Sequence, residues 1–195
     1  TSKRELESII REITKEMTTI FVTEFKKIDT YFQETFTEMF GGGKGSLVLG
    51  ITLDDLIDIM DIRLRCEGLA ARYAAMNRTQ EEADRLHHLM ELQDFYAAKD
   101  DYDHLREIDD EFHECIYEFC GRHVLMDTLR PLHRKTQRYR RGSISNTQRR
   151  QHSTDEHKAV CAAICAGDAD GADAAMTLHI QNAKKSMIER FSQNG

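Results

Sequence analysis

A length of 195 residues suits one compact domain of about 150 residues with an appendage, and a hydrophobic content of 40% excludes wholesale disorder. The formal net charge of −7 argues against a chain that binds DNA on its own, because DNA-binding chains usually carry a net positive charge or a basic surface. A single proline and 11 glycines leave few helix breakers, so we expect helices throughout.

Neither a membrane span nor a secretion signal is visible in the sequence. No stretch approaches the roughly 20 apolar residues that cross a bilayer, and the N-terminus lacks an apolar signal core. We therefore expect a cytoplasmic protein without a membrane partner. The five cysteines lack the paired spacing of a zinc ribbon, and in a reducing compartment we expect them to be small, buried apolar residues.

The first 40 residues predict one amphipathic helix. Apolar residues recur at steps of three and four from Ile9 to Phe40, which describes one stripe on a helical surface. Unbroken from Glu5, the helix would be on the order of 50 Å long. We expect it to end at the glycines at 41–43, and residues 46–49 to form a short strand.

The segment Glu5–Leu49 resembles part of the structural-maintenance-of-chromosomes ATPases, above all in the run IDTYFQETFTEMFGGGKGSLVL. The match falls where the returning coiled coil of those proteins enters the C-terminal half of the ATPase head. The motifs that hydrolyse ATP are missing, and Lys44 is followed by Gly45 instead of the hydroxyl residue that would hold magnesium. We therefore interpret residues 1–50 as a helical arm with a glycine-rich end and no ATPase function.

From Ile51 onward the pattern is a series of amphipathic helices with short connections. Three S/T-x-x-D/E capping boxes mark helix starts: Thr52 with Asp55, Thr79 with Glu82, and Ser153 with Glu156. The predicted helices cover residues 53–76, 80–98, 101–119, 123–141, 154–166 and 171–191. We expect a bend or break near Pro131, and the longest loop at 142–152. Residues 51–195 are thus predicted to form an all-α antiparallel bundle of about six helices.

One constellation stands out among the nine histidines. Asp109 and His113 lie four residues apart in EIDDEFHECI, which places them one turn apart on one helical face. His157 follows Glu156 near the start of a later helix, and His179 lies within the last. Three imidazoles and one carboxylate would suit zinc or a similar divalent ion, with positions left for water or a ligand. The alternative is a surface i,i+4 pair with two ordinary histidines elsewhere.

Residues 52–190 resemble the FCD domain, the C-terminal sensing domain of FadR-type regulators in the GntR family. Three segments carry the resemblance in the family's order: DIRLRCEGLAARYAA (Asp61–Ala75), IDDEFHECI (Ile108–Ile116) and STDEHKAVCAAICAGDADGADAAMTLHI (Ser153–Ile180). The resemblance implies a divalent metal inside the bundle, zinc first, with nickel or manganese as alternatives. Its implied ligands, carried over by motif position, are Asp109, His113, His157 and His179.

The same resemblance implies a role for Arg63 in effector binding. Arg63 falls in R-x-x-x-E with Glu67, where the family's arginine often faces the ligand cavity. A guanidinium beside a divalent cation suits a small carboxylate effector. The alternative is a plain intrahelical ion pair with Glu67, worth roughly a few tenths of a kcal/mol. The chain departs from the family at Arg122, which follows Gly121 where asparagine is common, so a helix-end contact is expected to be missing.

Three classes of function remain open on the sequence. We expect the effector-sensing domain of a bacterial transcription regulator, a homodimer that reaches DNA only through a winged helix absent from this chain. A metal-dependent hydrolase is the alternative, but Glu111 points away from the Asp109–His113 face, which leaves only Glu156 as a weak general base and no assigned catalytic residue. A structural coiled-coil module led by residues 1–50 is the third class.

Overall fold

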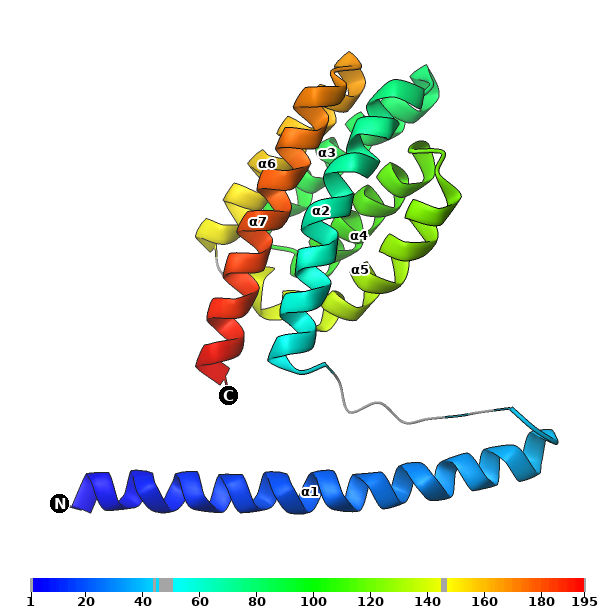
Figure 1. Ribbon diagram of the computed structural model, residues 1–195. Coiled ribbons are helices and arrows are strands. Elements are labelled where there is room, and N and C mark those ends of the chain that lie inside the picture. Colours follow the sequence, from blue (N-terminus) through cyan, green and yellow to red (C-terminus); the bar gives the residue numbers. More distant parts are fainter. Residues whose placement is uncertain (1, 44, 46–50, 145–146, 195) are drawn as a thin grey trace. The chain divides into compact units, whose positions relative to one another are not determined.

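The computed structural model describes residues 2–43, 45, 51–144 and 147–194 of the chain. These residues form seven α-helices, and none of them lies in a β-strand (Figure 1). The chain divides into two units, Thr1–Gly50 and Ile51–Gly195. The strand predicted at 46–49 lies outside the described residues. Within the described part, no helix combines the length and the apolarity that crossing a bilayer requires.

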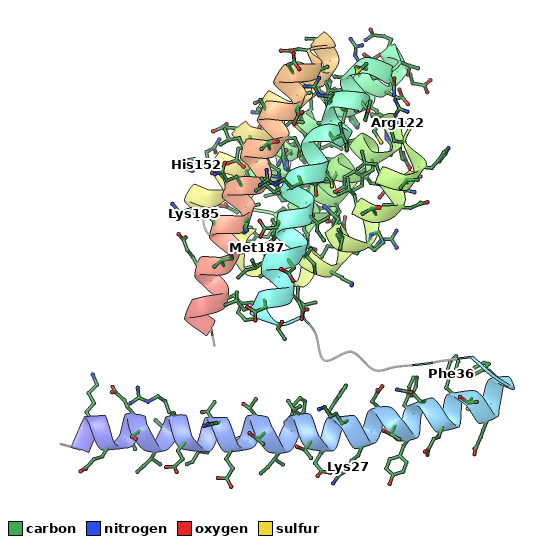
Figure 2. All side chains as sticks on the ribbon, viewed as in Figure 1. Lys27, Phe36, Arg122, His152, Lys185 and Met187 are labelled. Atoms are coloured by element: carbon green, nitrogen blue, oxygen red, sulfur yellow. The ribbon has the colours of Figure 1, made fainter. Side chains whose placement is uncertain are left out.

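The first unit is built on α1, which spans Ser2–Phe40 and confirms the predicted long helix. Its apolar side chains are largely exposed, with Phe21 at 60% and Phe40 at 67%. The helix ends where the next three residues, the glycines at 41–43, adopt positive φ angles, a conformation that costs glycine little. The side chain of Phe36, labelled in Figure 2, lies against the backbone of Gly45, so the chain folds back over the end of the helix.

The second unit is the predicted six-helix bundle. Its helices are α2 (Leu53–Asn77), α3 (Gln80–Ala97), α4 (Tyr102–Phe119), α5 (His123–Ile144), α6 (Thr147–Ala166) and α7 (Ala169–Asn194). Both predicted capping boxes at Thr52 and Thr79 are present, because each hydroxyl accepts a backbone N–H and each partner carboxylate accepts the N–H of the cap. In Figure 1, α2 and α7 run side by side in opposite directions.

Two expectations in the second half of the bundle are wrong. The predicted loop at 142–152 is helical in its described residues, since α5 continues to Ile144 and α6 begins at Thr147. The third capping box is absent because α6 begins at Thr147 and Ser153 lies inside it, and the carboxylate of Glu156 instead accepts from His179 and Asn182 of α7. Pro131 lies inside α5 at an exposed position, where solvent can reach the carbonyl that loses its donor, so the helix continues.

The bundle closes over one hydrophobic core to which all six helices contribute. Its fully covered members include Leu56, Phe112 and Met176, and Met187 on α7 is 3% exposed (Figure 2). Gly68 lets α2 approach α7 closely, because a Cβ atom there would lie 3.0 Å from the carbonyl oxygen of Asp173. The cysteines are free thiols, three of them buried as predicted, while Cys66 and Cys165 are partly exposed.

Candidate metal and effector site

Three histidines from three helices meet in the interior of the bundle. They are His113 on α4, His157 on α6 and His179 on α7, and none is more than 2% exposed. One ring nitrogen from each lies within 4.8 Å of the others. The core around them is apolar, and the ring of Phe112 stacks on His157 at 4.5 Å between centroids. Three imidazoles gathered in an apolar interior form an arrangement that suits a metal ion.

The spacing of two of these rings matches a pair of metal ligands. The Nε2 atoms of His157 and His179 lie 3.3 Å apart. Two nitrogens bound to one zinc ion at about 2.0–2.1 Å and a tetrahedral angle would lie about 3.4 Å apart. The opposite nitrogen of each ring has a protein partner. Nδ1 of His157 lies 3.3 Å from Oε1 of Gln93, to which it can donate, and Nδ1 of His179 lies 2.8 Å from Oε2 of Glu156. These contacts turn both Nε2 atoms towards the shared position.

His113 provides an independent test of whether a cation fits. Among the described residues, neither of its ring nitrogens has an aligned hydrogen bond, although the ring is fully buried. Oε2 of Glu67 lies 3.0 Å from Nδ1 and forms an ion pair with it, so Nε2 is the ring nitrogen for which no protein partner is found among the described residues. A buried polar atom without a partner costs about 1–3 kcal/mol, and an ion is one of the partners that removes this cost. The residues present therefore fit a bound cation.

Asp109 stands beside the three histidines. Its carboxylate oxygen Oδ1 lies 3.5 Å from Nε2 of His157, and the side chain is 15% exposed. Asp109 also belongs to a second group of close ligand atoms with Asp110 and His133. The structure thus groups His113, His157 and His179, whereas Asp109 lies outside that group and approaches it through its contact with His157.

Arg63 is fully buried and takes part in the same polar region. Its Nε donates to Oε1 of Glu67 at 2.5 Å, so the intrahelical ion pair is present, although in the core and not on the surface. A second nitrogen, Nη1, donates to the Thr136 hydroxyl at 2.8 Å. Burial alone would raise the pKa of Glu67, but the charge of Arg63 and the contact with His113 outweigh burial and hold this pKa well below its ordinary value. Glu67 is therefore a carboxylate in the core.

Sequence reasoning missed His133 on α5, which links Arg63 to α4. Its Nδ1 lies 3.3 Å from both Nη2 of Arg63 and the hydroxyl of Tyr117, and its Nε2 lies 3.1 Å from Asp110. Burial lowers the pKa of His133 to about 4, so the ring is neutral at pH 7 and its Nδ1 can accept a hydrogen bond. No motif or spacing links position 133 to the R-x-x-x-E or D-x-x-x-H pairs, so only the folded chain reveals the connection.

The departure from the family at Arg122 has a structural answer. The side-chain amide of Asn77 on α2 donates to the carbonyl of Cys120 at 2.9 Å, which supplies a contact at the end of α4 from another helix. Gly121 follows with φ of +64°, the left-handed conformation typical after a helix end. The guanidinium of Arg122 lies over the ring of Tyr73 at 4.3 Å (Figure 2). The end of α4 therefore has a side-chain contact although residue 122 is not asparagine.

Comparison with known proteins assigns the bundle to a family. The FCD domain matches residues 58–182. The putative L-lactate dehydrogenase operon regulatory protein of Escherichia coli K12 is 30% identical over 149 residues, which cover 72% of this chain and 54% of that protein. The HTH-type transcriptional repressor RspR of the same strain is 24% identical over 151 residues, covering 77% of this chain and 66% of the repressor. The chain thus spans about half the length of the first relative and just under two thirds of the second.

Solved structures share the fold at lower sequence identity. E. coli McbR/YncC superposes with a TM-score of 0.66 at 17% identity, covering 76% of this chain and 75% of that one. Streptococcus agalactiae GntR gives a TM-score of 0.60 at 22% identity, with coverages of 71% and 62%. The relatives are transcriptional regulators and not enzymes, which argues against the hydrolase alternative. The chain belongs to the FCD domain family, and its relatives are GntR-type regulators of transcription.

Proposed function

We propose that residues 51–195 are the effector-sensing domain of a transcription regulator and that this domain binds one divalent metal ion. The proposed ligands are Asp109, His113, His157 and His179. The observation that carries the proposal is the meeting of three buried imidazoles, together with the absence of a hydrogen-bond partner for Nε2 of His113 among the described residues. Zinc is the preferred ion, with nickel or manganese as alternatives, because imidazole and carboxylate ligands suit all three.

A small carboxylate is the proposed effector. Zinc held by these four ligands would have to expand to five-coordinate to take a carboxylate oxygen, whereas nickel or manganese with six positions would accept one directly. Arg63 supplies the second anchor through Nη2, whose contact with His133 is long at 3.3 Å. The surrounding carboxylates of Glu67, Asp109 and Asp110 would repel an anion in the absence of a cation. The metal must therefore bind first, and the effector depends on it.

We propose two macromolecular partners, DNA and a second copy of the bundle. Both matched bacterial relatives extend well beyond the aligned residues, and we propose that DNA is bound through a winged-helix domain that residues 1–195 do not contain. Apolar side chains recur every seven residues on α2, where Ile62 is 44%, Leu69 is 38% and Met76 is 61% exposed. Such a stripe supports pairing of two copies of the bundle into a homodimer.

Metal analysis tests the first step. The protein is stripped with a chelator, reloaded with zinc and assayed for bound metal per chain. We expect the double variant His157→Ala, His179→Ala to bind one equivalent less than the wild type, because two of the four ligands are gone. His123→Ala, which removes an exposed histidine, is the matched control and should bind the same amount as the wild type. Unchanged metal content in the double variant would show that the ligand set is wrong.

A thermal-shift screen of small carboxylates tests the second step. We expect a stabilising shift in the zinc-loaded protein and no shift in the stripped protein. Arg63→Lys keeps the charge but loses the planar fork that clamps a carboxylate, so it should retain zinc and lose most of the shift. A shift of equal size in the stripped protein would contradict an effector that depends on the metal.

A further inference from the structure

A second group of metal-ligating side chains lies between α3 and α6, apart from the histidines of the interior. It consists of His87 on α3 with Cys161 and Cys165 on α6, and one ligand atom from each lies within 4.8 Å of the others. The two sulfur atoms are 3.9 Å apart. Cys161 is 2% exposed and Cys165 is partly exposed, whereas His87 is exposed to solvent. The group therefore has a buried floor and an open side.

The distance between the sulfurs fits a single thiophilic ion. Two thiolates bound to zinc at about 2.3 Å and a tetrahedral angle would lie about 3.8 Å apart, close to the observed separation. The spacing of four residues places both sulfurs on one face of α6, so the helix itself fixes this distance. The remaining contact of Cys165, to the carbonyl of Ala83, is a weak sulfur interaction at 3.7 Å that a metal bond would readily replace.

The packing of α3 against α6 places the third ligand near the two sulfurs. His157, Cys161 and Cys165 follow one another at steps of four on the face of α6 that meets α3. At one end of this face, Gln93 of α3 contacts Nδ1 of His157, and near the other end Cys165 contacts Ala83. His87 lies on α3 between Ala83 and Gln93. The imidazole is thus presented to the two sulfurs by the packing of the helices.

We propose that His87, Cys161 and Cys165 form a second metal site, which takes a soft or borderline divalent cation such as zinc or cadmium. Two sulfurs and one imidazole nitrogen supply three positions of a tetrahedron, and the fourth opens towards solvent and takes water. Each thiol releases its proton to solvent as its sulfur binds the cation. The site contains thiolates and the histidine site does not, so the two are chemically distinct. The inference is independent of the proposed sensing function.

Cobalt absorption separates the two sites. The full chain, kept reduced with a phosphine, is titrated with Co²⁺ and followed in the near ultraviolet, where thiolate-to-cobalt charge transfer absorbs. We expect this band in the wild type and in His179→Ala, which alters only the other site. Cys161→Ser and Cys165→Ser should each lose most of the band, and their double variant should lose it all. Cys66→Ser, a thiol on α2, is the matched control and should retain it.

Because His87 is exposed, a variant at this position tests the proposed site with little risk of unfolding the protein. His87→Gln replaces a solvent-exposed side chain, so helical circular dichroism should be unchanged. Its cadmium affinity should fall about tenfold or more, since even an outer partner of a metal ligand is worth about 10–100-fold. His88→Gln, at the neighbouring exposed position, should bind cadmium as the wild type does. Absence of the cobalt band in the wild type, its survival in the double serine variant, or equal cadmium binding by His87→Gln would each overturn the site.

Discussion

Glu156 and His179 form a carboxylate–imidazole pair, in which Oε2 of Glu156 accepts a hydrogen bond from Nδ1 of His179 at 2.8 Å. The other oxygen of Glu156 accepts from the side-chain amide of Asn182 at 2.8 Å. Glu156 precedes His157 in the chain, so two adjacent residues of α6 act on one site in different ways. His157 points its own nitrogen inward, and Glu156 orients the imidazole of α7.

Loss of this carboxylate should weaken metal binding without removing a ligand. We expect Glu156→Ala to lower zinc affinity by about 10–100-fold, because the partner of a metal-binding histidine fixes its ring and raises its basicity. Competition against a coloured chelator measures the change. Asp155→Ala removes a carboxylate from the adjacent exposed position and should leave the affinity unaltered. Equal affinities for both variants would exclude this role for Glu156.

The close approach of α2 and α7 at Gly68 predicts a sharp steric penalty. A Cβ atom there would lie 2.2 Å from Oδ1 of Asp173 and 2.5 Å from Oγ1 of Thr177. Those side chains can rotate, but the carbonyl of Asp173 at 3.0 Å cannot. We expect Gly68→Ala to lower the free energy of unfolding in urea by about 1–3 kcal/mol, despite the better helix propensity of alanine. Arg65→Ala, at an exposed position of the same helix, should change it little; stabilisation by Gly68→Ala would refute the steric argument.

The turn after α4 predicts a graded response at Gly121. Its φ of +64° is strained for residues with a Cβ atom, at a cost of about 1–2 kcal/mol. Gly121→Ala should therefore lose about that much stability in chemical denaturation. Gly121→Asn should lose less, because asparagine tolerates the left-handed conformation. If alanine and asparagine proved equally harmful, crowding and not backbone conformation would be the cause.

The capping box of α2 predicts a dependence of stability on pH. The hydroxyl and backbone N–H of Thr52 hydrogen bond to Asp55 and lower the pKa of its carboxyl in the folded state. A lowered folded pKa stabilises the protein above the unfolded value of about 3.9, and this contribution is lost as the pH falls through the folded value. Asp55→Asn should therefore be less stable than the wild type at pH 7, with the difference shrinking below about pH 4.

Thermal unfolding at several pH values checks this prediction. Asp54→Asn makes the same change of charge next to the cap without touching the Thr52–Asp55 bonds, and it should show no such convergence with the wild type. A difference between Asp55→Asn and the wild type that stayed constant from pH 7 to strongly acidic solution would rule out the carboxylate as its source.

Deletion of residues 1–50 separates the sensing function from a structural role of the helical arm. Contacts within the chain divide into the units Thr1–Gly50 and Ile51–Gly195. We expect residues 51–195 to keep the metal content and the helical circular dichroism per residue of the bundle. Loss of metal binding on deletion would favour an assembly led by the arm. Such a structural role, suggested by the resemblance of residues 5–49 to chromosome-maintenance ATPases, stays a prediction.

The sequence predicted the helices well wherever local chemistry marks their ends. Thr52 and Thr79 carry their own capping partners, so α2 and α3 begin where expected. The start of α6 could not be predicted in this way, because the S-x-x-E spacing at Ser153 falls inside the helix and its glutamate contacts α7 instead of capping α6. The local sequence pattern does not show whether a carboxylate caps its own helix or hydrogen bonds to a side chain of another helix.

The candidate site was harder to predict from the residues than the fold. Spacing placed Asp109 and His113 on one face, but the meeting of His113 with His157 and His179 depends on the rotation of three helices about their axes. Periodicity does not fix that rotation, and only the family resemblance suggested it. His133 and Gln93 touch this region from α5 and α3 through contacts between residues 16 to 70 positions apart, for which no motif existed.

The burial of the three imidazoles also bears on how quickly this domain could respond. His113 and His157 are fully covered and His179 is 2% exposed, so the packed helices leave an ion no direct route to them. Capture and release of an ion at the proposed site would then require transient separation of neighbouring helices, and the frequency of that separation would set their rates. If the proposed metal site is occupied, its ion would therefore exchange slowly and follow only sustained changes in metal supply.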